Sequence, residues 1–461
     1  MPSFAGHFQY LKADGVALQS APCRVSFEAE SLTLTPASGP PLAFDLGDVD
    51  LFAPGDYEIT LTLYTGKRVV LSRFAKSFDN LRHDLLEAYR QRLLQCLLLE
   101  DLEEIARFDG FARLDSIGSP APTWASPAEF RLFQSNLAVL PIAATGFQWR
   151  LADIDALSFD EANYAVILES VGRRLTVTKL AKRTGEFKER LENAISELSE
   201  NSAKTLHGLF PFLTPDQFRV VAKLMKEGRA VRLAQLKSIH ARTEQALVAN
   251  VVDAKLKPYF DALTSQSRAG EVYTGFKLLR KDESEEKEAE QESVSPGAGA
   301  GAPQETLQAP PEIEEEGPAG AEAAKQPILH WFFFPLATKT APHASTLVAW
   351  EATTKSGRAT YFFRLAPPGE THALADPATR SAAMESGIRD LNRAIVMLNF
   401  RREPIYLPDD QLEIQPSFHR YAIACRKIPE LRRLRASFLG RAIHTSPQAW
   451  EKQLDGFLEM A

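Results

Sequence analysis

Basic side chains near the C-terminal end of the chain are the residues best suited to chemistry. A guanidinium group holds its N–H donors in a planar fork that matches the oxygens of a phosphate or a carboxylate. The candidates for an anion-binding or partner-binding face are Arg401, Arg402, Arg426, Lys427, Arg432, Arg433, Arg435 and Arg441. The favoured interpretation is a solvated surface on which these groups pair with Glu403, Glu430 and Asp410, and exposed pairs of this kind contribute little. Anion binding is the alternative.

Two pairs of aspartates recur at matching places, Asp48 with Asp50 and Asp153 with Asp155. Acid/base catalysis needs carboxylates placed about a substrate. An aspartate that follows a strand more often fixes a turn. We therefore interpret both pairs as turn residues.

Other signals of catalysis or of a cofactor are missing from the sequence. The nine histidines and three cysteines show none of the spacings typical of metal ligands. No Gly-x-Ser-x-Gly, Walker A or Gly-x-Gly-x-x-Gly motif occurs. We expect no cofactor, no metal and no catalytic residues, and an enzyme with an unrecognised site is the least favoured class.

The strands and helices expected in the first part of the chain form an internal repeat. Residues 42–93 and 147–198 match in their apolar positions and in the turn glycines Gly66 and Gly172, while the polar positions drift. Tyr57 and Tyr164 are also paired, each at the head of an alternating apolar run that predicts a half-buried strand. Each copy then changes to helical spacing, and Ser77 is the predicted N-cap of the first helix.

Antiparallel strands closed by one C-terminal amphipathic helix resemble the pleckstrin-homology-like (PH-like) fold. The resemblance covers roughly residues 20–105 and 125–200, and the tandem arrangement is similar to the doubled modules of FACT-type histone chaperones. It implies protein or peptide recognition at exposed strand edges and in the groove beside each terminal helix. Where lipid-binding members carry basic residues, this chain has Ala29-Glu30-Ser31 and Gln134-Ser135-Asn136, so membrane lipid is not an expected partner.

Charge and composition divide the rest of the chain. Residues 282–326 hold thirteen acidic residues and two lysines, a low-complexity stretch that predicts a disordered tether. The expected plan is a first module at 1–110, a second at 125–200, a helical connector at 201–280, the tether at 281–326 and a basic α+β domain at 327–461. Within the connector, Thr214 to Gln217 predicts a capped helix start, and 271–279 predicts a strand that returns to the second module. The C-terminal domain has the features of a degenerate third module.

These observations favour a non-enzymatic, cytoplasmic binding or scaffold protein of the α+β class. No secretory signal precedes residue 20, and three scattered cysteines indicate a reducing compartment. The alternative is nucleic-acid or chromatin-like binding through the arginine-rich C-terminal domain. A further hypothesis is that the acidic tether covers the basic face. The sequence does not indicate an oligomeric state.

Overall fold

The computed structural model describes three antiparallel sheets and the helices packed on them, so the predicted α+β class is confirmed. The described residues are 3–28, 30–117, 122–170, 172–267, 271–278, 328–337, 345–351, 359–365, 376–398, 401–415, 417–444 and 446–460. The predicted tether at 281–326 lies outside them. Among the described residues, no helix is both long and apolar enough to cross a membrane.

The first module is a curled seven-stranded sheet of order β4-β3-β2-β1-β7-β6-β5. Its strands are β1 (Ser3–Leu11), β2 (Ala17–Phe27), β3 (Ser31–Pro36), β4 (Leu42–Asp45), β5 (Val49–Pro54), β6 (Glu58–Leu63) and β7 (Arg68–Ser72). The residues before 20 carry too weak a pattern to place a strand at the centre of the sheet. In the structure β1 is central, pairing with both β2 and β7, and Phe8 is fully buried.

The second module repeats this order strand for strand as β11-β10-β9-β8-β14-β13-β12. Its strands are β8 (Glu104–Ser116), β9 (Pro122–Phe133), β10 (Asn136–Pro141), β11 (Phe147–Arg150), β12 (Ala156–Asp160), β13 (Ala165–Ser170) and β14 (Arg173–Thr178). The predicted boundaries are wrong here. Residues 104–116 belong to the second sheet as β8, and β9 begins at Pro122, before the expected start of the second module at residue 125.

Each module ends in a helix, as the PH-like resemblance implies. These are α1 (Phe78–Cys96) and α2 (Thr184–Leu209). Ser77 does occupy the N-cap position of α1, but its hydroxyl donates to the carbonyl of Phe74 and does not cap the helix. The α1 helix stops because Leu98 takes a positive φ of 57° while Leu99 donates back to the carbonyl of Leu94, a C-terminal motif that ends helices.

The backbones of the two modules match in their unusual conformations as well. Positive φ angles occur at Tyr57 and Tyr164, at Arg73 and Lys179, at Ala75 and Ala181, and at Gly66 and Gly172. Short 3-10 helices also recur, η1 (Leu46–Asp48) with η3 (Leu151–Asp153) and η2 (Ala75–Ser77) with η4 (Ala181–Arg183). Left-handed conformations are unfavourable for residues with a Cβ atom. Their recurrence at matching positions indicates one duplicated unit.

The third sheet joins the connector to the C-terminal part in the order β15-β16-β17-β18-β19-β20. Its strands are β15 (Val231–Arg232), β16 (Tyr273–Leu278), β17 (Ile328–Ala337), β18 (Ser345–Glu351), β19 (Ala359–Arg364) and β20 (Phe438–Ile443). The strand predicted at 271–279 therefore pairs with β17 and not with the second module. Unlike the modules, this sheet has its first strand at an edge, so it lacks the order expected of a third copy.

Both faces of the third sheet are covered by helices. On β17, Trp331 and Phe333 enter one apolar cluster while Phe332 and Phe334 enter another. The connector helices are α3 (Pro215–Leu224), α4 (Leu233–Ile239), α5 (Arg242–Val251) and α6 (Lys257–Gln266). The C-terminal helices are α8 (Pro377–Met397), α9 (Glu403–Tyr406), α10 (Asp409–Ile414), α11 (His419–Lys427), α12 (Pro429–Ser437) and α13 (Pro447–Met460). The capping box predicted at Thr214 and Gln217 is confirmed at the start of α3.

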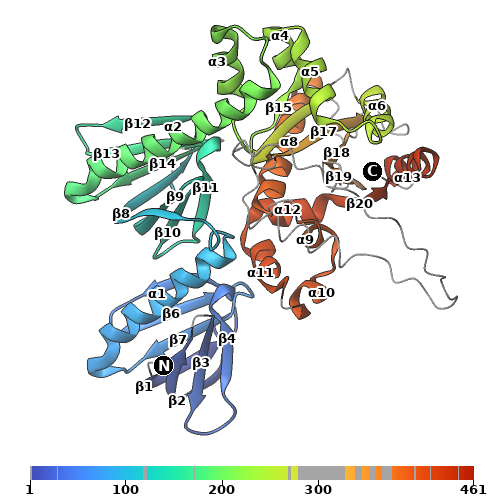
Figure 1. The fold of residues 1–461 in the computed structure, drawn as a ribbon. Coiled ribbons are helices and arrows are strands. Elements are labelled where there is room, and N and C mark those ends of the chain that lie inside the picture. Colours follow the sequence, from blue (N-terminus) through green and yellow to red (C-terminus); the bar gives the residue numbers. More distant parts are fainter. Residues whose placement is uncertain are drawn as a thin grey trace, which may run out of the picture.

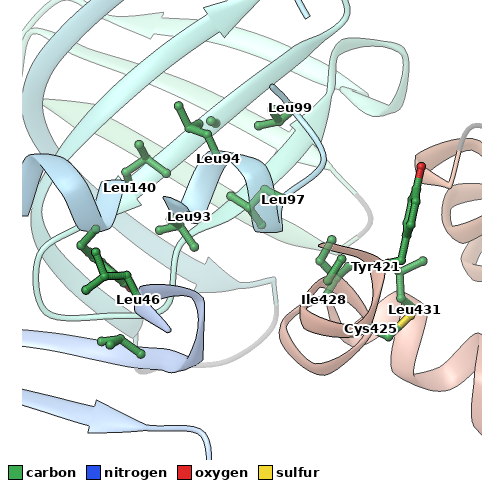
Figure 2. Packing of buried hydrophobic residues seen from close by; sticks show 14 of the residues in the cluster. Leu46, Leu93, Leu94, Leu97, Leu99, Leu140, Tyr421, Cys425, Ile428 and Leu431 are labelled. Atoms are coloured by element: carbon green, nitrogen blue, oxygen red, sulfur yellow. The ribbon is translucent and has the colours of Figure 1, made fainter. Parts of the chain in front are cut away.

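The modules and the C-terminal part meet at the end of α1. In Figure 1 the two modules lie one beyond the other, and α11 and α12 approach the junction between them. Figure 2 shows Leu93, Leu97 and Leu99 of this end lying between Leu140 of the second module and Ile428 of the C-terminal part. The sheets are separate, but this shared apolar cluster joins three parts of the chain into one body.

Candidate functional site

The recurring aspartates lie at the corner of each module that faces the C-terminal part. In both copies the apolar residue that opens the 3-10 helix, Leu46 or Leu151, is fully buried and fixes the corner. The aspartates that follow, Asp48 and Asp153, point their carboxylates at basic groups of the C-terminal part. We call these two places the acidic corners, residues 46–50 and 151–155.

Helix α11 binds the first acidic corner through Arg426. Its guanidinium lies 2.9 Å from the Asp48 carboxylate and 2.6 Å from Glu413, and it stacks over the Tyr64 ring at 4.8 Å. Burial alone would lower the pKa of Arg426, but Asp48 is the main cause that raises it above its usual value. Asp45 adds a second contact, since it accepts from Arg92 at 2.7 Å and lies 3.4 Å from His419.

Lys427 enters the same corner as a buried ammonium group. It donates to the carbonyl oxygens of Gly47 at 2.8 Å and Val49 at 2.6 Å, and it lies 3.7 Å from Asp50. Burial lowers the pKa of Lys427, and the nearby carboxylates offset this only in part. A lysine held in this way is not accessible to an external anion.

The second acidic corner is bound by different elements with the same chemistry. Arg393 of α8 lies 3.1 Å from Asp153 and also donates to Ser170 at 3.3 Å. Arg229 of the connector lies 3.9 Å from Asp155. The aspartates are thus more than turn residues, because they form ion pairs with basic residues of the connector and the C-terminal part.

The predicted basic face is not one surface. Arg435 donates to the carbonyls of Pro404 and Leu407 and to Asp409, so it ties α12 to the segment before α10. Arg433 pairs with Asp390 at 3.2 Å and more loosely with Glu430, as the surface alternative expects.

The other predicted arginines lie apart from these. Arg401 stacks over Tyr421 at 5.6 Å, and Arg441 over Tyr406 at 4.0 Å. The backbone N–H of Arg402 donates to Glu403. Arg432 is exposed.

A buried charge cluster between the modules was not predicted. Three arginines and three glutamates from α1, β8 and β9 form it, namely Arg90, Arg107, Arg131, Glu87, Glu104 and Glu129. Glu129 and Arg131 are each only 2% exposed. Partial burial would raise the pKa of Glu87, but a hydrogen bond from Gln91 and the nearby guanidinium groups hold it below its usual value. In sequence these residues look like ordinary solvated charges, so only the packing of α1 against β9 identifies them.

The cysteines give no sign of nucleophilic chemistry. Burial raises the pKa of Cys96 to about 12 and those of Cys23 and Cys425 to about 11, so the thiolate form is suppressed. Across the part of the chain that the structure describes, no cluster of His, Cys, Asp and Glu is arranged to hold a metal ion.

Comparisons with known proteins identify no family. No known family model matches the chain, and no curated protein sequence matches it. A solved structure described as "Structure of the Spt16D Pob3N heterodimer" matches with 14% identity over 37% of this chain and 83% of the other, at a TM-score of 0.16. A superposition at that score carries no functional inference.

Proposed function

We propose that this chain is a non-enzymatic scaffold whose two PH-like modules bind protein partners. Each module has two opposite ends. The acidic corners bind the chain's own basic residues, while the ends that carry η2 and η4, with the starts of α1 and α2, point away from the C-terminal part (Figure 1). Two such ends held on one rigid body support simultaneous binding to one partner.

Exposed tyrosines at these free ends carry the proposal. Tyr57 is 75% exposed and Tyr164 is 69% exposed, although the sequence placed both on the buried face of a strand. That placement is wrong because each tyrosine precedes its strand in a turn with positive φ, 57° and 48°. Tyrosine is enriched at the energetic centres of protein interfaces, because it buries a large ring and offers a hydroxyl.

Both tyrosines hold a backbone conformation that is unfavourable for a residue with a Cβ atom. A left-handed conformation costs a residue with a Cβ atom roughly 1–2 kcal/mol, and glycine avoids most of that cost. The chain uses glycine at one shared left-handed position, Gly66 and Gly172, and residues with a Cβ atom at the others, which are Tyr57 and Tyr164, Arg73 and Lys179, and Ala75 and Ala181. Keeping tyrosine in both copies, where glycine would be more stable, favours a role in recognition.

Cationic residues accompany both tyrosines. Arg73 follows β7 and Tyr57 precedes its partner β6, while Lys179 follows β14 and Tyr164 precedes its partner β13, so each basic residue leaves the sheet at the same end as the tyrosine. Both basic side chains are exposed. The outer strands β5 and β12 end their sheets, so they offer the strand edges expected from the PH-like resemblance.

The structure gives little support to nucleic-acid binding by the basic residues of the C-terminal part. Arg426 and Lys427 are bound to the first acidic corner, and Arg435 to its own domain. Of the eight basic residues singled out in the sequence, the exposed ones are Arg432, Arg433 and Arg441.

Comparative affinity capture tests the proposed function. The full chain and the Tyr57→Ala/Tyr164→Ala variant are each used as bait, with Ile414→Ala as control, because Ile414 is 78% exposed and lies on α10 of the C-terminal part. We expect a protein that both the wild type and the control retain and that the double variant loses, with binding that changes little between low and high salt. Identical captured proteins for all three baits would refute the tyrosine site. Binding that falls steeply with salt and survives the double variant would favour nucleic acid instead.

A further inference from the structure

A polar cavity of about 400 Å³ lies where all parts of the chain meet. Its walls come from the turn after α1, from β10 and β11, from α2, from residues 227–228 and 277–278, from the end of α8, from Arg401 and from the start of α11. This volume falls within the range of small-molecule sites. Neither Tyr57 nor Tyr164 lines it.

Arg150 is a cationic residue in the lining of this cavity. It closes strand β11, and its guanidinium donates to the carbonyls of Gly228 at 2.8 Å and Glu227 at 3.3 Å. Among the described residues no carboxylate forms an ion pair with it. Burial lowers the pKa of Arg150, as expected of a cation whose charge is poorly compensated, although Asp153 and Glu227 act in the opposite direction.

The backbone is built to admit this side chain. Gly228 has a φ of +74°, and a Cβ atom placed there would lie 1.8 Å from Nη2 of Arg150. Any larger residue at 228 would displace the guanidinium from the cavity wall.

The surrounding groups suit an oxyanion. The lining holds four cationic residues, Arg150, Lys277, Arg401 and Arg420, against three acids, Asp101, Glu197 and Glu227. Arg420 pairs with Asp101 at 3.3 Å and also with Glu100 outside the lining, so it adds no free positive charge, and Glu227 accepts from the backbone N–H of Leu278 at 3.1 Å. Glu197 is exposed on α2.

Amide and hydroxyl groups complete the wall. Asn136 is 8% exposed and donates to Gln148, which in turn donates to the carbonyl of Leu97 at 2.6 Å. The hydroxyl of Ser135 donates to Asn136 at 2.6 Å. A site with one central guanidinium and neutral polar groups around it is suited to a small anion with several oxygen atoms.

We infer that this cavity binds a small oxyanion, a phosphate or a carboxylate, with Arg150 as its direct charge partner. The ligand would contact the turn after α1, the second module and the C-terminal part together. It would therefore stabilise the arrangement of the modules, a role distinct from partner binding at Tyr57 and Tyr164.

Anion titration of the full chain tests this site. Inorganic phosphate and acetate are titrated separately at constant ionic strength, with thermal unfolding and calorimetry as readouts. We expect saturable binding of one of them and an unfolding temperature that rises with its concentration. Arg150→Met should weaken binding by about tenfold or more, since it removes a charged hydrogen-bond donor. The control Arg432→Met, at an exposed residue of α12, should bind as the wild type does.

A second variant keeps the inference testable if Arg150→Met does not fold. Asn201 is exposed on α2 and lines the cavity, so Asn201→Trp fills the opening without removing any cation. This variant should fold and lose saturable binding. An absence of saturable binding by wild type would overturn the inference, as would undiminished binding by Asn201→Trp or equal losses in Arg150→Met and Arg432→Met.

Discussion

Removing Glu129 from the buried charge cluster should destabilise the contact between the modules by about 3 kcal/mol. Breaking a buried ion pair by removing one partner costs roughly 3–5 kcal/mol, because the other charge is left without compensation. Here the low end applies, since Arg131 keeps Glu87 at 3.3 Å and Glu104 at 3.4 Å after Glu129→Ala. The control Glu192→Ala breaks an exposed pair with Lys188 at 3.6 Å and should cost about 0.5 kcal/mol or less.

Urea unfolding followed by tryptophan fluorescence measures this effect. Trp124 and Trp149 lie in the second module, which contains Glu129, and Trp331, Trp350 and Trp450 lie in the C-terminal part, so the fluorescence follows the unfolding of both parts. Replacing both partners, as Glu129→Leu/Arg131→Leu, should cost less than Glu129→Ala alone because no buried charge is left unpaired. A single-variant loss below about 1 kcal/mol, or a double-variant loss equal to the sum of the two single losses, would refute this reasoning.

Two further predictions concern single residues. Gly228→Ala should lower the free energy of unfolding by about 2 kcal/mol, because a residue with a Cβ atom there has a positive φ and clashes with Arg150. The control Gly208→Ala, whose Cβ atom would meet nothing within 4 Å, should be neutral or stabilising in thermal unfolding. Burial lowers the pKa of His330 from 6.5 to about 4, so the unfolded chain binds the proton first and stability falls as pH drops through that window. Between pH 7 and pH 5 the loss should be about 2 kcal/mol, and it should vanish in His330→Leu; an unchanged pH dependence in that variant would exclude His330 as the cause.

Local patterns in the sequence were sufficient to predict the modules. Alternating apolar residues and a helical stripe, both repeated, indicate a sheet followed by a helix in each copy, and the apolar faces of β6 and β13 are buried as expected. The boundaries were harder because they depend on long-range pairing. Strand β1 pairs with β7 across some sixty residues of chain, and β16 pairs with β17, which begins only at Ile328. Nothing local distinguishes a central strand from an edge strand in such cases.

The partners of the charged residues could not be predicted from the sequence. The sequence shows that arginines are concentrated before its C-terminal end. It does not show which acidic residues pair with them in the fold. Arg426 meets Asp48 and Arg393 meets Asp153, and the members of each pair are hundreds of residues apart. The recurrence of the aspartates was the available signal. It identified the right residues, and their function as docking points followed only from the geometry.

A charge-exchange cycle at the second acidic corner tests most directly whether these corners hold the modules on the C-terminal part. Asp153 and Arg393 are 14% and 16% exposed, so Asp153→Arg and Arg393→Asp should each lower the free energy of unfolding by about 2 kcal/mol. The double exchange restores an ion pair with reversed sign and should recover at least half of the summed loss. Strictly additive losses in the double variant would contradict docking through the acidic corners.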